Sequence, residues 1–95
     1  STAITTAFEK LKTYLEQNNY TRYFASMDTY NKKNTFITVH GFDNEGAALA
    51  FAERLKNNEE MEWETAPIVI TSSNYRVVQI HKNLDAYLNQ QINQQ

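Results

Sequence analysis

The stretch His40-Gly41-Phe42-Asp43-Asn44-Glu45-Gly46-Ala47-Ala48-Leu49-Ala50-Phe51-Ala52-Glu53-Arg54-Leu55 decides the fold. A β-branched run at 35–39 leads into it, and an Asp-Asn pair then turns the chain into an alanine-rich amphipathic segment. Because alanine side chains are short, the axis of such a helix can come close to the strands. The stretch therefore predicts a sheet with a helix packed tightly on it, and it contains no catalytic motif.

The residues before this stretch predict a helix and a β-hairpin. Apolar residues recur on one helical face over 2–18, which predicts the helix. Residues 20–30 read as a strand with apolar side chains on both faces, and the run from Thr35 to Phe42 reads as its returning partner. The polar segment 31–34 between them predicts a four-residue hairpin loop.

The residues after it predict further helices and one more strand. We expect Asp43 to cap the second helix, which runs to about Asn57. The continuous apolar run from Ala66 to Thr71 predicts an interior strand, with Pro67 near its start. For Tyr75 to Lys82 two interpretations stay open: a helix capped by Ser72 or Ser73, which we prefer, or a strand because of its β-branched residues.

The C-terminal segment completes the expected domain. Asn83 is placed to cap a last helix, and residues 90–95 are expected to be a frayed tail. The 95 residues suit one domain with one modest core. We predict that this core consists of the following apolar residues: Phe36 or Ile37, Val39, Phe51, Leu55, Ile68 and Ile70.

Composition excludes several classes of function. A net charge of −2 gives no basic face for nucleic acid or anionic lipid. The absence of cysteine excludes disulfides, thiolate metal sites and a cysteine nucleophile. No apolar run is long enough to insert into a membrane, and a chain that opens Ser-Thr-Ala without Met is expected to be excised from a larger protein.

No constellation of side chains predicts catalysis, a cofactor or a metal. His40 and His81 have no ligand spacing around them, so we interpret them as structural or surface residues. Trp63 lies in an acidic connection and is either a lid over the core edge or an exposed hot spot. The candidate partner surface consists of large apolar and aromatic side chains: Met61, Trp63, Tyr23 and Tyr75.

Two local patterns resemble a known domain over residues 2–90. Val39-His40-Gly41-Phe42-Asp43-Asn44, followed by Ala47-Ala48 and Phe51-Ala52, is similar to its strand-to-helix segment. Ile68-Val69-Ile70-Thr71-Ser72-Ser73-Asn74-Tyr75, followed by Lys82-Asn83-Leu84-Asp85-Ala86-Tyr87-Leu88, is similar to its C-terminal segment. The domain is the sporulation-related-repeat-like terminal domain of tetratricopeptide-repeat cell-envelope proteins of the Bacteroidetes, which are associated with gliding motility and type IX secretion.

The resemblance implies a fold and a kind of function. The fold is a small α+β, ferredoxin-like sandwich related to βαββαβ, an antiparallel sheet with helices on one face. Its first strand is missing here, because this chain opens on a helix. The gap is then closed by the remaining strands, by Tyr75–Ile80 acting as a strand, or by a neighbouring molecule.

The implied function is a non-catalytic interaction module of the cell envelope or periplasm, with another protein or a peptidoglycan-type glycan as its partner. Weak self-association through a strand edge is also expected. The alternative is a small-ligand-binding or enzymatic α+β domain that uses the tyrosines and His40.

Overall fold

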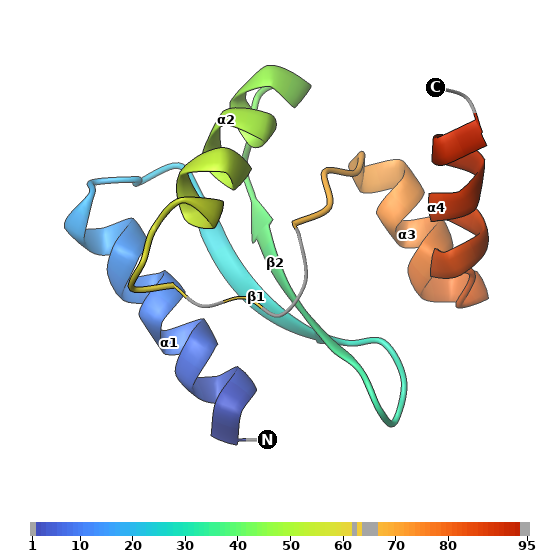
Figure 1. The fold of residues 1–95 in the computed structure, drawn as a ribbon, viewed down its shortest axis with the longest axis horizontal. Coiled ribbons are helices and arrows are strands. Elements are labelled where there is room, and N and C mark those ends of the chain that lie inside the picture. Colours follow the sequence, from blue (N-terminus) through green and yellow to red (C-terminus); the bar gives the residue numbers. More distant parts are fainter. Residues whose placement is uncertain (1, 62, 64–66, 94–95) are drawn as a thin grey trace.

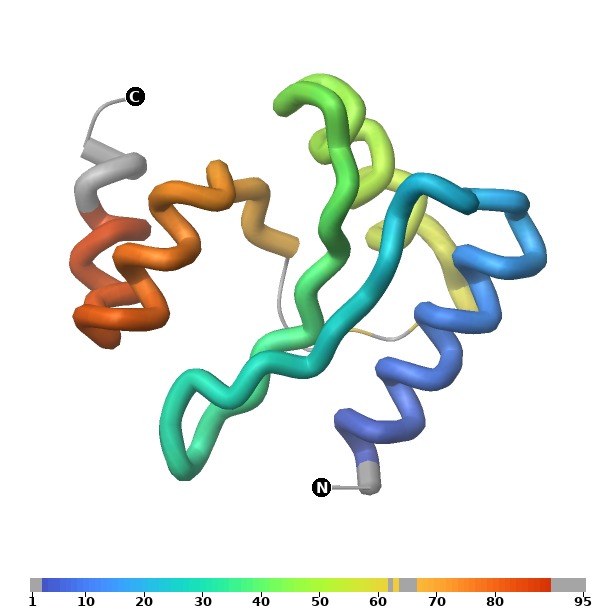
Figure 2. Tube along the Cα trace, turned by 180° about the vertical axis from the view of Figure 1, so that it is seen from behind, coloured from blue at the N-terminus to red at the C-terminus, as the bar shows by residue number. Residues whose placement is uncertain are grey.

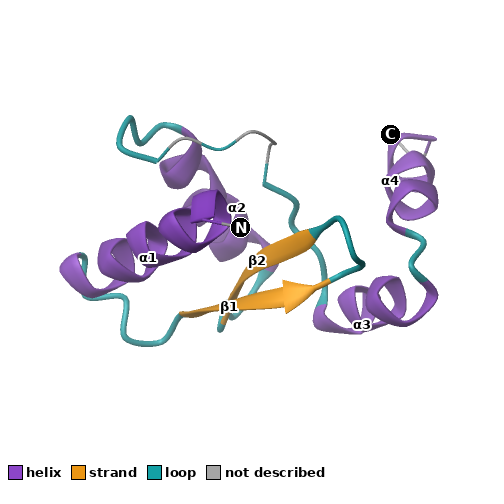
Figure 3. Ribbon diagram, turned by 90° about the horizontal axis from the view of Figure 1, so that it is seen from below, coloured by secondary structure: helices purple, strands orange, loops and turns teal. Residues whose placement is uncertain are grey.

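A two-stranded antiparallel hairpin lies at the centre of the structure, with helices on both of its faces (Figure 1 and Figure 3). The computed structural model describes residues 2–61, 63 and 67–93. Its elements in chain order are α1 (Thr2–Gln17), β1 (Phe24–Thr29), β2 (Thr35–His40), α2 (Glu45–Lys56), α3 (Ser72–His81) and α4 (Leu84–Asn93). The chain is a small α+β domain, as the sequence predicts.

The hairpin forms because its loop supplies its own hydrogen-bond acceptor. The Asn31 side chain accepts from the backbone N–H groups of Lys33 and Asn34, both at 2.9 Å. This Asx-type turn stabilises the loop, in which side-chain hydrogen bonds replace those of the strand ladder. In the resulting register Phe24 lies opposite His40 and Thr29 lies opposite Thr35.

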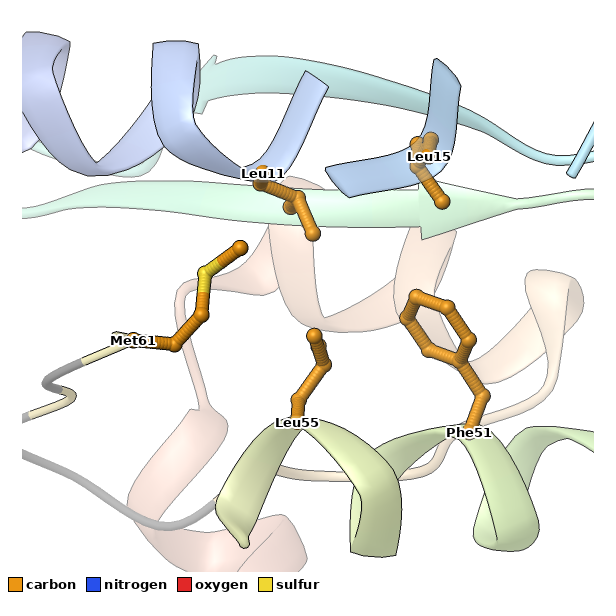
Figure 4. Packing of buried hydrophobic residues seen from close by; sticks show 5 residues of the cluster. All are labelled: Leu11, Leu15, Phe51, Leu55 and Met61. Carbon is orange, nitrogen blue, oxygen red and sulfur yellow. The ribbon is translucent and has the colours of Figure 1, made fainter. Parts of the chain in front are cut away.

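One face of the hairpin carries the main core. Ala25, Ile37 and Val39 point to this face, and they pack against a buried cluster that α1, α2 and Met61 in the connection after α2 supply. The cluster consists of five apolar side chains, which converge in Figure 4: Leu11, Leu15, Phe51, Leu55 and Met61. A ring of tyrosines and Phe42 surrounds Phe51 at centroid distances of 5.4 to 6.1 Å. Aromatic contacts of this kind add to the burial of apolar area.

The predicted core is confirmed in part. Phe51 and Leu55 are buried, with Ile37 and Val39 packed on them. Ile68 was expected in the same core, but 46% of it is exposed. Ile70 is half-buried and lies outside this cluster. The α1 leucines and Met61 take these places, because the amphipathic stripe of α1 covers the same face of the sheet.

The expected strand at 66–71 is the main difference from the sequence interpretation. Ala66 lies outside the described residues, and Pro67 to Thr71 form no strand. An apolar run becomes a strand only where another strand offers hydrogen bonds, and Pro67 itself lacks an N–H group. Residues 72–81 form α3, so the helical interpretation of this segment is correct and it does not act as a strand.

Helix α3 lies on the face of the hairpin opposite α1 and α2, whereas the sequence predicts helices on one face. The Tyr75 hydroxyl reaches Thr38 and Asp28, both of which point away from the main core. From behind, α3 and α4 lie on the β2 side of the hairpin and α1 lies on the β1 side (Figure 2). The polar side chains on this second face form hydrogen bonds with α3. A prediction that considers only apolar residues does not detect such a contact.

Two of the three predicted helix caps are displaced by one residue, whereas Asn83 directly precedes α4 and its backbone carbonyl accepts from Tyr87 N–H at 3.0 Å. Asn44, and not Asp43, caps α2: its Oδ1 accepts from Ala47 N–H at 2.8 Å. Thr71, and not Ser72 or Ser73, caps α3 by accepting from Asn74 N–H at 3.1 Å. Neighbouring residues here have similar capping propensities, so the residue at which the helix begins decides which of them is the cap. Helix α4 extends to Asn93, and Gln94 and Gln95 of the expected tail lie outside the described residues.

Candidate functional site

The four residues of the predicted partner surface do not lie together. Met61 is buried in the core cluster, and Trp63 and Tyr23 pack against that cluster. Tyr75 lies half-buried on the opposite face of the hairpin. The position of Trp63 fits the lid over the core edge and not the exposed hot spot.

Tyr75 is instead the centre of a polar network between α3 and the hairpin. Its hydroxyl donates to Asp28 Oδ2 at 2.6 Å and accepts from Gln79 Nε2 at 2.9 Å. The same hydroxyl lies 3.1 Å from Thr38 Oγ1. The network joins α3 to both strands, which makes it a structural element of this face.

The network also sets the ionisation of its two acidic groups. Burial raises the pKa of Asp28, but hydrogen bonds from Tyr75, Thr38 and Ser26 outweigh it, so the pKa lies below its usual value. Burial and the hydrogen bond to Asp28 both raise the pKa of Tyr75 above its usual value. Asp28 is therefore held as a carboxylate and Tyr75 as a neutral donor at neutral pH.

A serine and a histidine meet beside this network. Ser26 Oγ lies 2.9 Å from His40 Nε2, a distance at which a histidine can act as a base toward a hydroxyl. The Asp28 carboxylate on the same face accepts from Tyr75, and no hydrogen bond between Asp28 and His40 is found in the described residues. The pair therefore lacks the carboxylate that orients the histidine in a catalytic triad.

Sequence reasoning missed this pair because it depends on register. Ser26 lies opposite Thr38, so His40 is its diagonal neighbour on the same face. The signal was present in the alternation of the two strands, but it becomes visible only once the hairpin loop fixes the pairing. His81, by contrast, is exposed in the last turn of α3.

The remaining features of the described residues give little support for a further site. Among residues 2–61, 63 and 67–93, no group of three His, Asp or Glu side chains is close enough to hold a metal ion. The helices of this described part are too short or too polar to span a bilayer. An open hollow is lined by five consecutive residues of the α1–β1 connection, Asn19 to Tyr23.

The outer edge of β1 is the most distinctive surface. Within the described chain β1 pairs only with β2, so its other edge has no strand partner. Tyr30 N–H donates to the Asn34 carbonyl at 3.0 Å, which fixes the phase of the ladder. Since hydrogen-bonded pairs alternate in an antiparallel ladder, the backbone groups of Ala25 and Met27 point outward, away from β2.

Apolar side chains flank these outward backbone groups. Phe24 is 61% exposed and Met27 is 42% exposed, and they lie on opposite faces of β1. The Phe24 ring stacks on the His40 ring at 4.8 Å. No charged residue interrupts the run from Phe24 to Met27, so this edge lacks the lysines and prolines that usually block strand addition.

Comparison with known proteins gives no match: no family model fits the chain, and neither a curated protein nor a solved structure shows significant similarity to it. The resemblance to the terminal domain of envelope proteins therefore stays a prediction.

Proposed function

We propose that this chain is a non-catalytic protein-interaction module that binds an extended polypeptide segment as a third strand at the outer edge of β1. The observation that carries the proposal is the free edge itself, with outward backbone groups and exposed apolar side chains at Phe24 and Met27. Strand addition uses main-chain hydrogen bonds for affinity and alternate side chains for selectivity.

The arrangement of the helices favours β1 over β2 as the docking edge. Helix α3 and residues 67–71 before it lie on the β2 side, whereas α1 extends beyond the outer edge of β1 (Figures 1 and 2). An added strand next to β1 would lie beneath α1 and continue the covered face. A sheet of only two strands is marginal in water, so a third strand also stabilises the domain.

The polar network supports a binding role over an enzymatic one. Its carboxylate and tyrosine are hydrogen-bonded to each other, and among the described residues no third group is hydrogen-bonded to His40 of the Ser26–His40 pair. The resemblance to the terminal domain of gliding-motility and type IX secretion proteins also supports this proposal, and it adds the bacterial cell envelope as the setting.

A library of extended seven-residue peptides displayed on phage tests the proposal directly. We expect selected peptides to shift the NMR amide signals of Ala25, Met27 and their neighbours. Met27→Pro removes an outward N–H, and Met27→Lys adds a charge to the edge, so each variant should lose at least tenfold in affinity.

Thr35→Pro is the matched control, because it changes an exposed strand residue on β2 instead. Peptides that bind the Met27 variants as tightly as the parent chain, or whose signals map to α3 and α4, would show that β1 is not the docking edge.

A glycan is the second candidate partner, and the exposed Phe24 ring favours it. The ring lies flat on His40, next to the Ser26 hydroxyl, so an apolar surface and a hydrogen-bonding group adjoin. Co-sedimentation with purified peptidoglycan tests this candidate. Phe24→Ala should abolish the co-sedimentation and Leu49→Ala, at a half-exposed apolar position on α2, should not.

A further inference from the structure

We infer that the strand added at β1 runs antiparallel to it and carries a basic side chain, arginine or lysine, opposite Asp28. This inference rests on the strand-addition function proposed above and gives the chemical class of its ligand. That class is an extended basic segment in which polar and apolar residues alternate. The antiparallel direction follows because such pairs are more stable per residue than parallel pairs and more common.

The alternation along β1 decides which ligand residues form main-chain hydrogen bonds. The backbone hydrogen bond from Tyr30 to Asn34 fixes the phase of the ladder with β2. The outward backbone groups of β1 therefore belong to three residues, Ala25, Met27 and Thr29. Ligand residues opposite these three exchange hydrogen bonds with β1, and their side chains lie on the face of the main core. The partly exposed Met27 side chain lies there too, so apolar ligand side chains fit these positions.

The ligand residues between them lie on the second face, where the Tyr75 network is. They oppose Phe24, Ser26 and Asp28 in non-hydrogen-bonded pairs. In such pairs the Cα atoms are only about 4.5 Å apart, so the side chains are closest there. The exposed Phe24 ring shows that this face is accessible at the edge of β1. A side chain opposite Asp28 is therefore within contact distance of its carboxylate.

Asp28 carries the only formal charge on β1, and it selects a basic ligand residue. Its pKa lies below the usual value, so the group is a carboxylate at neutral pH. Neither of the two ion pairs found in the described part of the chain involves Asp28. An ionised carboxylate can accept about four hydrogen bonds, and the chain supplies donors for three of them: Tyr75, Thr38 and Ser26. One further donor from a ligand can therefore be accepted.

The charge at this position separates basic from acidic ligands. Opposite charges in a cross-strand pair are stabilising, and like charges directly opposite each other are destabilising. An arginine or lysine opposite Asp28 gains the first effect, whereas a glutamate there incurs the second. The net charge of −2 on the whole chain acts in the same direction.

A peptide with both ends capped, of sequence Thr-Arg-Ile-Thr-Val-Tyr from its N-terminus, tests the inference. Bound antiparallel, it places arginine opposite Asp28 and its isoleucine and valine opposite Met27 and Ala25. Replacing the arginine by glutamate should raise the dissociation constant at least tenfold in NMR titrations of the parent chain. The reversed peptide places its arginine on the core face, so it should bind at least fivefold more weakly than the forward peptide. Tighter binding of the reversed peptide would overturn the antiparallel direction.

Asp28→Asn isolates the contribution of the charge. Asparagine retains an oxygen that can accept from the Tyr75 hydroxyl, so the variant keeps this hydrogen bond. The arginine and glutamate peptides should bind this variant within about threefold of each other. Asp85→Asn is the matched control, because it removes the same charge from an exposed position on α4 and should keep the tenfold preference. A tenfold preference that persists in Asp28→Asn would overturn Asp28 as the group that recognises the basic residue.

The outcomes separate this inference from the strand-addition function. Arginine and glutamate peptides that shift the amide signals of Ala25 and Met27 with equal affinity for the parent chain would overturn the basic ligand. They would also leave strand addition standing. This comparison needs only the parent chain, so it decides the question even if Asp28→Asn does not fold. If neither these peptides nor peptides selected from the library shift those signals, strand addition at β1 is wrong as well.

Discussion

Gly41 is the residue whose backbone the fold restricts most. Its φ of 108° lies in a region that side-chain-bearing residues avoid, and a Cβ atom here would collide with the Arg22 carbonyl oxygen. Gly41→Ala should therefore cost about 1–3 kcal/mol in the free energy of unfolding, as measured by urea denaturation. Gly46→Ala is the control, because Gly46 lies in the first turn of α2 and alanine favours helices. Equal losses in both variants would contradict this account.

The hydrogen bond between Tyr75 and Asp28 makes stability depend on pH. The pKa of Asp28 is depressed in the folded chain, so the stability from its ionised form is present above the unfolded pKa of about 4 and is lost as pH falls. Tyr75→Phe removes the donor at 2.6 Å and should cost about 1 kcal/mol at pH 7.

At pH 2 the same substitution should cost less, because a fall in pH protonates Asp28 and weakens its hydrogen bond to the Tyr75 hydroxyl. Above about pH 10 the parent chain also loses stability as Tyr75 ionises, since its pKa is raised and the neutral hydroxyl is the favoured form. Urea denaturation at pH 2 and pH 7 measures the comparison. A cost at pH 2 as large as that at pH 7 would show that the Asp28 charge is not involved.

At the scale of the element, α2 contributes the aromatic centre of the core. Phe51 is 3% exposed and four aromatic rings surround it, so Phe51→Ala should cost about 3–5 kcal/mol. Leu49→Ala on the same helix is the control, because half of Leu49 is exposed and little area is lost there. Thermal and urea denaturation measure both, and a cost below about 1 kcal/mol for Phe51→Ala would contradict the core described here.

Elements with local signals could be predicted from the sequence, and those that depend on distant partners could not. Each of these signals involves residues only a few positions apart in the sequence: the periodic leucines of α1, the loop at Asn31 and the alanine face of α2. The run at Ile68 has strand composition, but it forms a strand only if a neighbour pairs with it. The same limit applies to the candidate site.

The free edge of β1 follows from the missing third strand, and the Ser26–His40 and Tyr75–Asp28 contacts follow from register and from the packing of α3. None of these is a local property of the chain. The residues of the predicted partner surface do not form one surface for the same reason. Large apolar residues such as Met61 are buried in the small core instead.

At the scale of the whole molecule, the domain is slightly more extended than its length requires. Its radius of gyration is 13.7 Å, against about 12 Å for a compact domain of this size. The excess reflects a two-stranded sheet with α1 and α2 on one side and α3 and α4 on the other (Figure 1).

Amide hydrogen exchange, resolved by residue in β1, tests the central claim most directly. The inward amides of Ser26 and Asp28 pair with β2, and within the described part of the chain the outward amides of Ala25 and Met27 have no strand partner. At micromolar concentration we expect at least tenfold slower exchange for the inward pair, and outward amides that become protected as a bound peptide fills the edge. Outward amides that are already protected at micromolar concentration would contradict the account, because the edge would then be covered within the chain itself.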